Sequence, residues 1–111
     1  MARYLELHGG TNDVAVKGTN FRQKHVPPVG TYWFVLEAEP LNRADPNAVQ
    51  VVAKKPVGYL PAGIAPAWSP LCQSIGRRRF TVEGEVRLTP DGRARWVLLW
   101  LPDPEAVASL L

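Results

Sequence analysis

The last third of the chain carries the pattern that most restricts the fold, a regular alternation of apolar and polar side chains. In residues 79–88 every second position is apolar or glycine, with arginine, threonine and glutamate between them. Residues 89–93, TPDGR, have the composition of a tight turn, and residues 93–101, RARWVLLWL, form a second apolar run. Because a strand turns alternate side chains to opposite faces, this pattern predicts a β-hairpin. Gly84 in mid-strand is typical of a strongly curled sheet.

Shorter stretches of the same alternation predict four more strands. They lie at 14–18, 31–39, 48–54 and 57–60, and turn-forming residues fill the segments between them. Short strands in this number would leave many open sheet edges, and closure into a barrel removes those edges. The sequence therefore predicts a mainly β protein built on a small six-stranded β-barrel.

Residues 61–75 are the main candidate for a helical segment, and they fall between the fourth and fifth predicted strands. Apolar residues recur there at spacings of three and four. Pro61 suits a first helical turn, whereas Pro66 and Pro70 lie inside the pattern, where proline lacks the backbone donor that a helix needs. We expect these prolines to kink or split the segment, giving one or two short helices.

The length of the chain, 111 residues, is enough for one hydrophobic core. We expect a single domain over residues 1–111, with its core at about 12–101 and with 102–111 as a short tail or helix. Asp103 and Pro104 suit the cap and the first position of such a helix. No apolar run approaches the roughly 18 residues that cross a bilayer, and the first residues do not form a signal peptide. A cytoplasmic protein is therefore expected.

The composition gives little guidance on partners. The net charge of +3 slightly favours polyanions, but many proteins that bind no nucleic acid share it. The single cysteine, Cys72, is expected to be a small buried apolar residue, because no set of zinc ligands accompanies it. A sequence rich in alanine, arginine, proline and valine is compatible with a GC-rich bacterial genome.

No arrangement typical of an enzyme occurs in the sequence. His8 and His25 fall in predicted surface loops, and there is no nucleophile elbow, phosphate-binding glycine loop or metal-ligand spacing. Glu83 and Glu85 share a strand face, but the arginines beside them favour a solvated, charge-mixed surface over an acid/base pair. We therefore expect a non-enzymatic protein that holds no cofactor and no metal.

Basic and aromatic side chains offer a different kind of site. Single-stranded DNA is bound by cations along its phosphates and by aromatic rings on which bases stack, and Phe21 beside Arg22 in a polar loop fits this need. Two basic runs supply possible phosphate contacts, namely Lys54, Lys55, Arg77, Arg78 and Arg79. In a strand, the first and third arginines of the second run would point to one side and the middle one to the other. Each run is equally well explained as solvated surface.

Three segments, in this order, resemble the HIRAN family. They are VKGTNFRQ at 16–23, LEAEPLNRADPNAVQVV at 36–52 and VGYLP at 57–61, the last followed by Ala65. The resemblance covers residues 12 to about 88, and its core is an EPxNxxDxNAV element with VGYLP shortly after it. It implies a modified OB-like barrel. It also implies a pocket for the 3′-hydroxyl end of single-stranded DNA, as in the members attached to fork-remodelling helicases, and hence a role in DNA repair or replication-fork processing.

The resemblance also implies roles for individual residues. Phe21 would stack on the terminal base, and Asp45 would accept a hydrogen bond from the 3′-hydroxyl. A carboxylate suits that task because it accepts from a hydroxyl but repels a terminal phosphate. The remaining positions would shape the pocket (Asn42, Asn47 and Tyr59) or contact the backbone (Lys17, Asn20 and Arg22).

The chain departs from the family pattern just before Asp45. The DNA-binding members carry a second stacking tyrosine where this chain has Ala44, and a proline where it has Arg43. One lost stacking face removes about 1–3 kcal/mol of binding free energy per base. The guanidinium plane of Arg43 can stack in partial compensation. If the stacking of Arg43 does not compensate for the missing tyrosine, the pocket serves another ligand.

Turn chemistry explains the same motif without any ligand. Asp45 and Asn47 can bond the backbone of their own turn, and Tyr59 can fill an end of the barrel.

A protein-interaction or dimerisation module is the alternative function. Trp96 and Trp100 share one face of the last predicted strand, and with the helix that carries Trp68 they can form an apolar docking surface. As a free-standing DNA-binding domain, the chain is expected to need a helicase, nuclease or other protein partner to perform chemistry. The sequence leaves open the oligomeric state, and whether RNA is accepted as readily as DNA.

Overall fold

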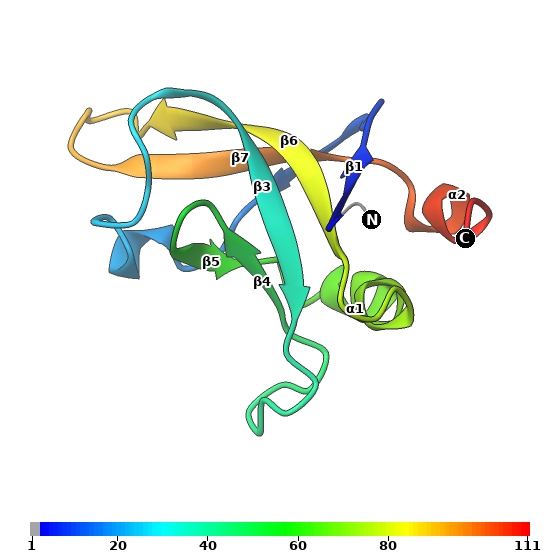
Figure 1. Cartoon of the computed structure of the whole chain (residues 1–111). Coiled ribbons are helices and arrows are strands. Elements are labelled where there is room, and N and C mark those ends of the chain that lie inside the picture. The colour runs from blue at the N-terminus through cyan, green and yellow to red at the C-terminus, as the bar shows by residue number, and fades with distance from the viewer. Residues whose placement is uncertain (1–2) are drawn as a thin grey trace.

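The computed structural model describes residues 3–111, and its main feature is a strongly curled β-sheet (Figure 1). Along the chain the elements are β1 (Tyr4–Leu7), β2 (Asn12–Ala15), the 3-10 helix η1 (Thr19–Phe21), β3 (Gly30–Ala38), β4 (Val49–Val52), β5 (Pro56–Tyr59), α1 (Ala65–Ser74), β6 (Arg79–Leu88), β7 (Arg95–Leu101) and α2 (Pro104–Ala108). The hairpin predicted from the last third of the sequence is β6 and β7.

The curled sheet is antiparallel along its main path, with the strand order β2-β7-β6-β3-β4-β5. A bridge between Lys17 and Tyr59 joins the two ends of this path. The Lys17 N–H donates to the Tyr59 carbonyl at 2.8 Å, and the Tyr59 N–H donates to the Lys17 carbonyl at 2.9 Å. The predicted mainly β, OB-like fold is confirmed, with its helical insertion between β5 and β6.

The prediction of six strands was wrong by one. β1 pairs in parallel with the first half of β6, where Tyr4 lies opposite Arg79 and Leu7 opposite Val82. Only four residues form this strand, and the partner lies more than seventy positions away in the sequence. A local pattern carries little information on such a pairing, because strand preference is decided largely by neighbouring strands.

One ten-residue helix, α1, occupies the proline-rich insertion, and it is not split. Pro66 falls in the first turn, where a backbone N–H has no partner within the helix. Pro70 lies inside the helix and is exposed, so its ring projects toward solvent. The expectation of one or two short helices is confirmed with a single helix, since only Pro70 removes a bond that the helix would otherwise make.

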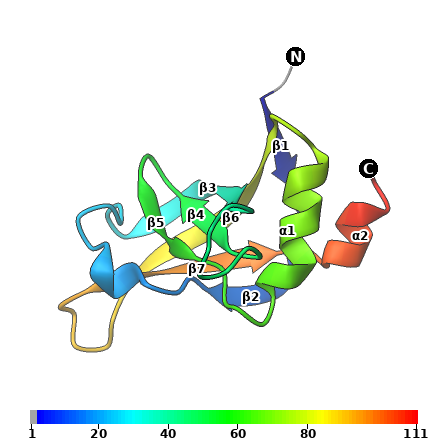
Figure 2. The same cartoon turned by 90° about the horizontal axis from the view of Figure 1, so that it is seen from below.

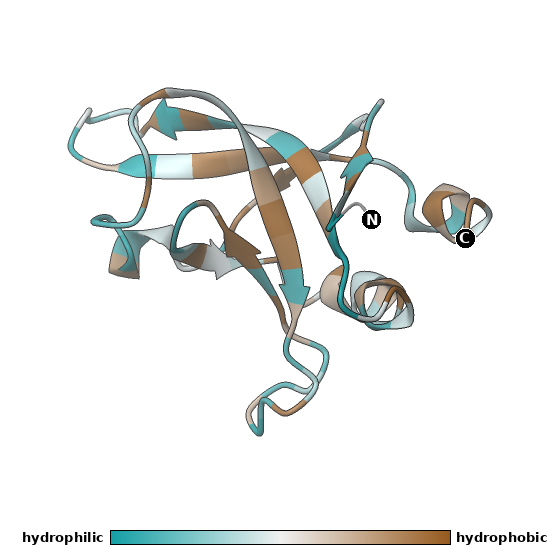
Figure 3. Ribbon diagram, viewed as in Figure 1, coloured by the Kyte–Doolittle hydropathy of each residue, from teal (hydrophilic) through white to brown (hydrophobic). Residues whose placement is uncertain are grey.

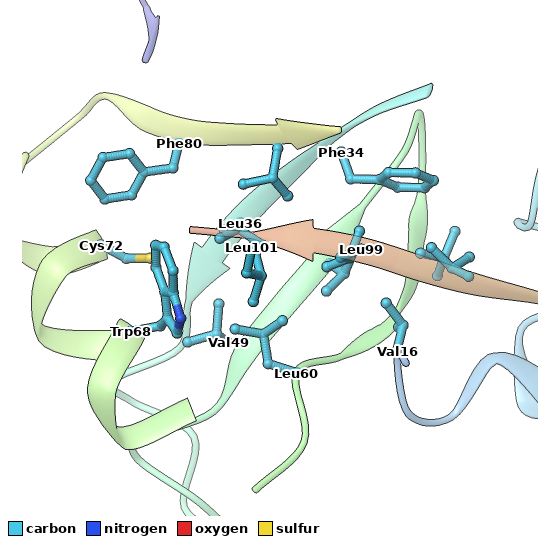
Figure 4. Packing of buried hydrophobic residues seen from close by; sticks show 14 of the residues in the cluster. Val16, Phe34, Leu36, Val49, Leu60, Trp68, Cys72, Phe80, Leu99 and Leu101 are labelled. Carbon is cyan, nitrogen blue, oxygen red and sulfur yellow. The ribbon is translucent and has the colours of Figure 1, made fainter. Parts of the chain in front are cut away.

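The core fills the space between the curled sheet and α1. Phe34, Leu36 and Leu99 are fully buried on the inner faces of β3 and β7, and Figure 3 shows hydrophobic residues along these strands. From α1, Trp68 packs edge-on against Phe80, with ring centroids 6.2 Å apart, as Figure 4 illustrates. Trp68 is only 1% exposed, so its side chain belongs to the core and adds nothing to an outer face of α1.

The C-terminal residues form α2, which lies beside α1 (Figure 2). Asp103 caps it by accepting a hydrogen bond from the Glu105 N–H, and Pro104 occupies its first turn. Val107 is buried and attaches the helix to the core. Within residues 3–111 no helix has the length and apolar character that crossing a membrane requires.

Candidate nucleic-acid interface

The loop between β3 and β4 is a compact turn held by its own side chains. The Asn42 carboxamide oxygen accepts from the N–H groups of Ala44 at 3.0 Å and Asp45 at 3.2 Å. The Asp45 Oδ1 atom in turn accepts from the Asn47 N–H at 2.9 Å. The ligand-free explanation from turn chemistry thus holds for Asp45, whereas the second side chain that bonds the turn is Asn42 and not the expected Asn47. Among residues 3–111, none donates a hydrogen bond to Asp45 Oδ2, so this oxygen is available to an outside donor.

Four of the predicted site residues line one open pocket of about 330 Å³ at the edge where the sheet closes. Lys17 and Tyr59 come from the bridge that joins the sheet ends, whereas Asn42 and Asp45 come from the β3–β4 turn. The other walls are Ala48, Leu60 and Ala62. The pocket therefore combines a cation, a carboxylate, an amide and an aromatic ring from segments distant in sequence.

A neighbouring depression of about 530 Å³ shares Asn42 and Tyr59 with this pocket and adds Glu39 to its lining. The Asn42 Nδ2 group donates to Glu39 Oε1 at 3.1 Å, which fixes the amide between the two hollows. Burial raises the pKa of the Tyr59 hydroxyl, the Glu39 carboxylate adds to the increase, and the charge of Arg22 opposes it. Tyr59 thus stays a neutral hydroxyl that can donate and accept hydrogen bonds.

Phe21 projects from η1 with 84% of its surface exposed. The helix follows Gly18, which has a left-handed φ of 84°, and it turns the chain outward directly after the Lys17 bridge. Phe21 therefore does not fill an end of the barrel. With Asn20 and Arg22 it borders a further hollow of about 670 Å³. Arg22 lies close enough to the Tyr59 hydroxyl for its charge to lower the pKa of that group.

Comparisons with known proteins give one line of evidence on the fold. No family model matches the chain, and no curated protein matches it. A crystal structure of the HIRAN domain of human HLTF superimposes on it with a TM-score of 0.52, at 21% sequence identity. The match covers 90% of this chain and 84% of that domain. The chain has the fold of a HIRAN domain.

The HIRAN fold brings the segments that carried the resemblance to one edge of the barrel. The first ends in η1, the second holds the β3–β4 turn, and the third is β5 with Tyr59. Five of the nine predicted residues lie outside the pocket lining. Asn20, Phe21 and Arg22 border the neighbouring hollow, and Arg43 and Asn47 are exposed on their turn.

The two basic runs lie at different places on the HIRAN fold. Lys54 and Lys55 form the tight turn between β4 and β5, whereas Arg77 and Arg78 lie between α1 and β6 and Arg79 begins β6. β3 lies between β6 and β4 in the sheet. Arg77 and Arg78 precede the strand, so the expected alternation of the three side chains was wrong. Arg79 is engaged within the protein, because it lies 3.8 Å from the Glu37 carboxylate and donates to the Gly76 carbonyl.

The tryptophan face on β7 is partly covered. Trp96 and Trp100 are half-buried, and the Leu98 side chain between them is 7% exposed. The Arg87 guanidinium lies 5.9 Å from the centre of the Trp96 ring, at a distance typical of a cation–π contact. The opposite face of β7 is buried in the core, as the apolar run 93–101 indicated.

Sequence reasoning missed residues that only the fold brings to this side of the molecule. Glu39 and Gln50 both act on the Tyr59 hydroxyl. Gln23 connects the η1 loop to β7 through hydrogen bonds with Arg95. All three lie within the segments that resemble the HIRAN family, but the resemblance implied no role for them, and the contact of Gln23 joins positions 72 residues apart.

Proposed function

We propose that this HIRAN-fold domain binds the 3′-hydroxyl end of single-stranded DNA and serves DNA repair or replication-fork processing. The observation that carries the proposal is the convergence of Lys17, Asn42, Asp45 and Tyr59 on one open pocket beside the exposed Phe21. A nucleic-acid end needs these elements together: a cation for the last phosphate, an acceptor for the hydroxyl and a ring for the base.

Asp45 supplies the selectivity for the end of the strand. Its Oδ1 atom is held by the Asn47 N–H, which fixes the plane of the carboxylate, and Oδ2 then accepts the hydrogen bond of the 3′-hydroxyl. A strand that ends in a phosphate would bring a second negative charge to this position and be repelled. A continuing strand would lack the donor. The turn chemistry and the ligand role are thus compatible, because they use different oxygens of one side chain.

Lys17, Arg22 and Phe21 supply most of the affinity. Lys17 lines the end pocket and Arg22 borders the neighbouring hollow, and both attract the terminal phosphates. Phe21 is free to stack on the last base. The missing aromatic at Ala44 leaves only one stacking face, so we expect weaker binding than a pocket with two, by about 1–3 kcal/mol.

The test compares two labelled oligonucleotides that differ only in a 3′-hydroxyl or a 3′-phosphate, by fluorescence anisotropy at low salt. The wild-type chain is expected to bind the hydroxyl end more tightly. Asp45→Asn should reduce the preference at least about fivefold, since a hydrogen bond to a charged acceptor contributes about 1.5–3 kcal/mol. Asn keeps the Oδ1 acceptor for the turn, so this variant retains the local fold.

Asp13→Asn is the matched control, because it removes one charge from β2, where Asp13 is exposed opposite Trp100. It should leave the preference unchanged. Equal binding of both oligonucleotides by the wild-type chain would contradict end recognition. Failure of either strand to bind would contradict the DNA-binding proposal as a whole.

A further inference from the structure

A cleft of about 760 Å³ lies between the segment that follows η1, the start of β3 and the turn between β4 and β5. Its lining is rich in basic and aromatic side chains: Lys24, His25, Tyr32, Trp33, Lys54, Lys55 and Arg95, together with Val26, Pro27, Pro28 and Ala53. No aspartate or glutamate belongs to this lining. The cleft is thus positive at neutral pH, in a chain whose net charge is only +3.

The walls of the cleft are fixed by hydrogen bonds from three sides. The His25 Nδ1 atom lies 2.8 Å from the Pro56 carbonyl, which ties the η1 loop to β5. The Tyr32 hydroxyl donates to the Pro28 carbonyl at 2.7 Å. Val26, 2% exposed, anchors the same loop in the core. A cleft that is already formed in the free protein orders little on binding, which favours affinity.

The backbone of Arg95 forms the third attachment. The Gln23 Nε2 group donates to the Arg95 carbonyl at 2.7 Å, and the Arg95 N–H donates to Gln23 Oε1 at 2.9 Å. The Arg95 guanidinium also donates to the Gln23 carbonyl at 3.4 Å. These bonds hold the guanidinium at the rim of the cleft, where it can meet a phosphate.

The cleft is continuous with the surface around Phe21. The hollow bordered by Asn20, Phe21 and Arg22 extends to Lys24 and His25, and these two residues also line the cleft. Arg22 acts on Tyr59, which belongs to the end pocket. A chain of cationic groups therefore runs from Lys17 past Arg22 and Lys24 to Lys54, Lys55 and Arg95.

We infer that single-stranded DNA leaves the end pocket in the 5′ direction, passes over η1 and enters this cleft. The inference rests on the proposed function, because the end pocket sets where the strand begins. In the cleft, Lys54, Lys55 and Lys24 contact phosphates of nucleotides upstream of the terminal one. Trp33, 41% exposed at the border of the cleft, offers a ring on which one of those bases stacks.

The test is the dependence of affinity on oligonucleotide length. Labelled strands of about three and about ten nucleotides, each with a 3′-hydroxyl, are titrated with the protein and followed by fluorescence anisotropy. The two lengths are chosen because single-strand sites of this type span about 4–16 nucleotides. The longer strand is expected to bind at least about tenfold more tightly and to show a steeper salt dependence. The double variant Lys54→Gln/Lys55→Gln should lose most of that gain and keep the preference for a 3′-hydroxyl over a 3′-phosphate.

Arg77→Gln/Arg78→Gln is the matched control, because it removes the same charge from the segment between α1 and β6, and neither arginine belongs to the lining of the cleft. It should keep the gain with length. Equal binding of the short and long strands, or an equal loss in both double variants, would overturn the strand path and leave the end pocket standing. Loss of affinity in the lysine variant without any hydroxyl preference in the wild-type chain would instead overturn the end pocket, and with it the proposed start of the path.

Discussion

Gly58 lies against Lys17 so closely that a β-carbon at position 58 would be 2.2 Å from the Lys17 carbonyl oxygen. The same atom would lie 2.7 Å from a methyl group of Val16. Gly58 also has a φ of 156°, a backbone conformation that residues with a β-carbon rarely adopt. The bridge that joins the sheet ends, and carries Lys17 and Tyr59 into the candidate pocket, therefore depends on a glycine here.

Replacement of Gly58 by alanine is expected to lower the free energy of unfolding by about 3 kcal/mol, because the backbone of Lys17 must move away. Urea unfolding measures this loss. Gly63→Ala is the control, since its β-carbon would meet nothing within 4 Å, and it should change stability by less than about 0.5 kcal/mol. Similar stabilities of the two variants would show that the close approach is not required.

Cys72 makes the stability depend on alkaline pH. Burial raises the pKa of its thiol from 9.0 to about 12. Below the pKa of the thiol in the unfolded chain, the folded and unfolded states both carry the proton, so the thiol does not lower the free energy of unfolding. Between the pKa of the thiol in the unfolded chain and its pKa in the folded chain, only the unfolded chain ionises, so the free energy of unfolding falls as the pH rises. We expect a loss of about 1 kcal/mol between about pH 8 and pH 10 relative to Cys72→Ala, measured by urea unfolding. Parallel pH profiles for the two proteins would contradict this.

Gln23 is expected to control local opening of the η1 loop. Gln23→Ala removes the bonds to both backbone groups of Arg95, at a cost of about 1–3 kcal/mol for the groups left unpaired. Amide hydrogen exchange at Arg95 should accelerate at least about fivefold. Gln73→Ala loses a bond to Ser69 within α1 and should leave exchange at Arg95 unaffected. Unchanged protection at Arg95 in the Gln23 variant would show that the loop is held by other contacts.

Ala44 offers a gain-of-function test of the proposed pocket. Ala44→Tyr restores an exposed aromatic ring to the turn next to Asp45, and one stacked base contributes about 1–3 kcal/mol. Binding of a short single-stranded oligonucleotide, measured by anisotropy, should tighten about fivefold or more. Ala106→Tyr places the same ring on the exposed side of α2 as a control. An equal gain in both variants would indicate non-specific stacking.

The strands of the barrel were predictable because each buries one regular face. β3 and β6 alternate over nine and ten residues, β7 is a continuous apolar run of seven, and the inner positions of all three are buried in the structure. β1 was not predictable, since four residues without a strong pattern become a strand only by pairing with Arg79–Val82. α1 stayed whole because Pro66 falls in the first turn, where its missing donor has no consequence.

The candidate site was predictable in its residue types and not in its surroundings. The turn-forming residues of the β3–β4 loop are recognisable from a short stretch of sequence, because the hydrogen bonds that Asn42, Asp45 and Asn47 make lie within that stretch. The environment of Tyr59 and the basic cleft depend on strand order and on contacts between remote positions. No short segment contains that information.

The measurement that tests the account most directly is a two-dimensional amide NMR titration of the chain with a short DNA strand that carries a 3′-hydroxyl. The account predicts that the largest shifts fall on the β3–β4 turn, η1 and Tyr59, with Asp45 among them, and that a 3′-phosphate weakens them. Shifts concentrated on Trp96 and Trp100 of β7, or none in the turn, would contradict it.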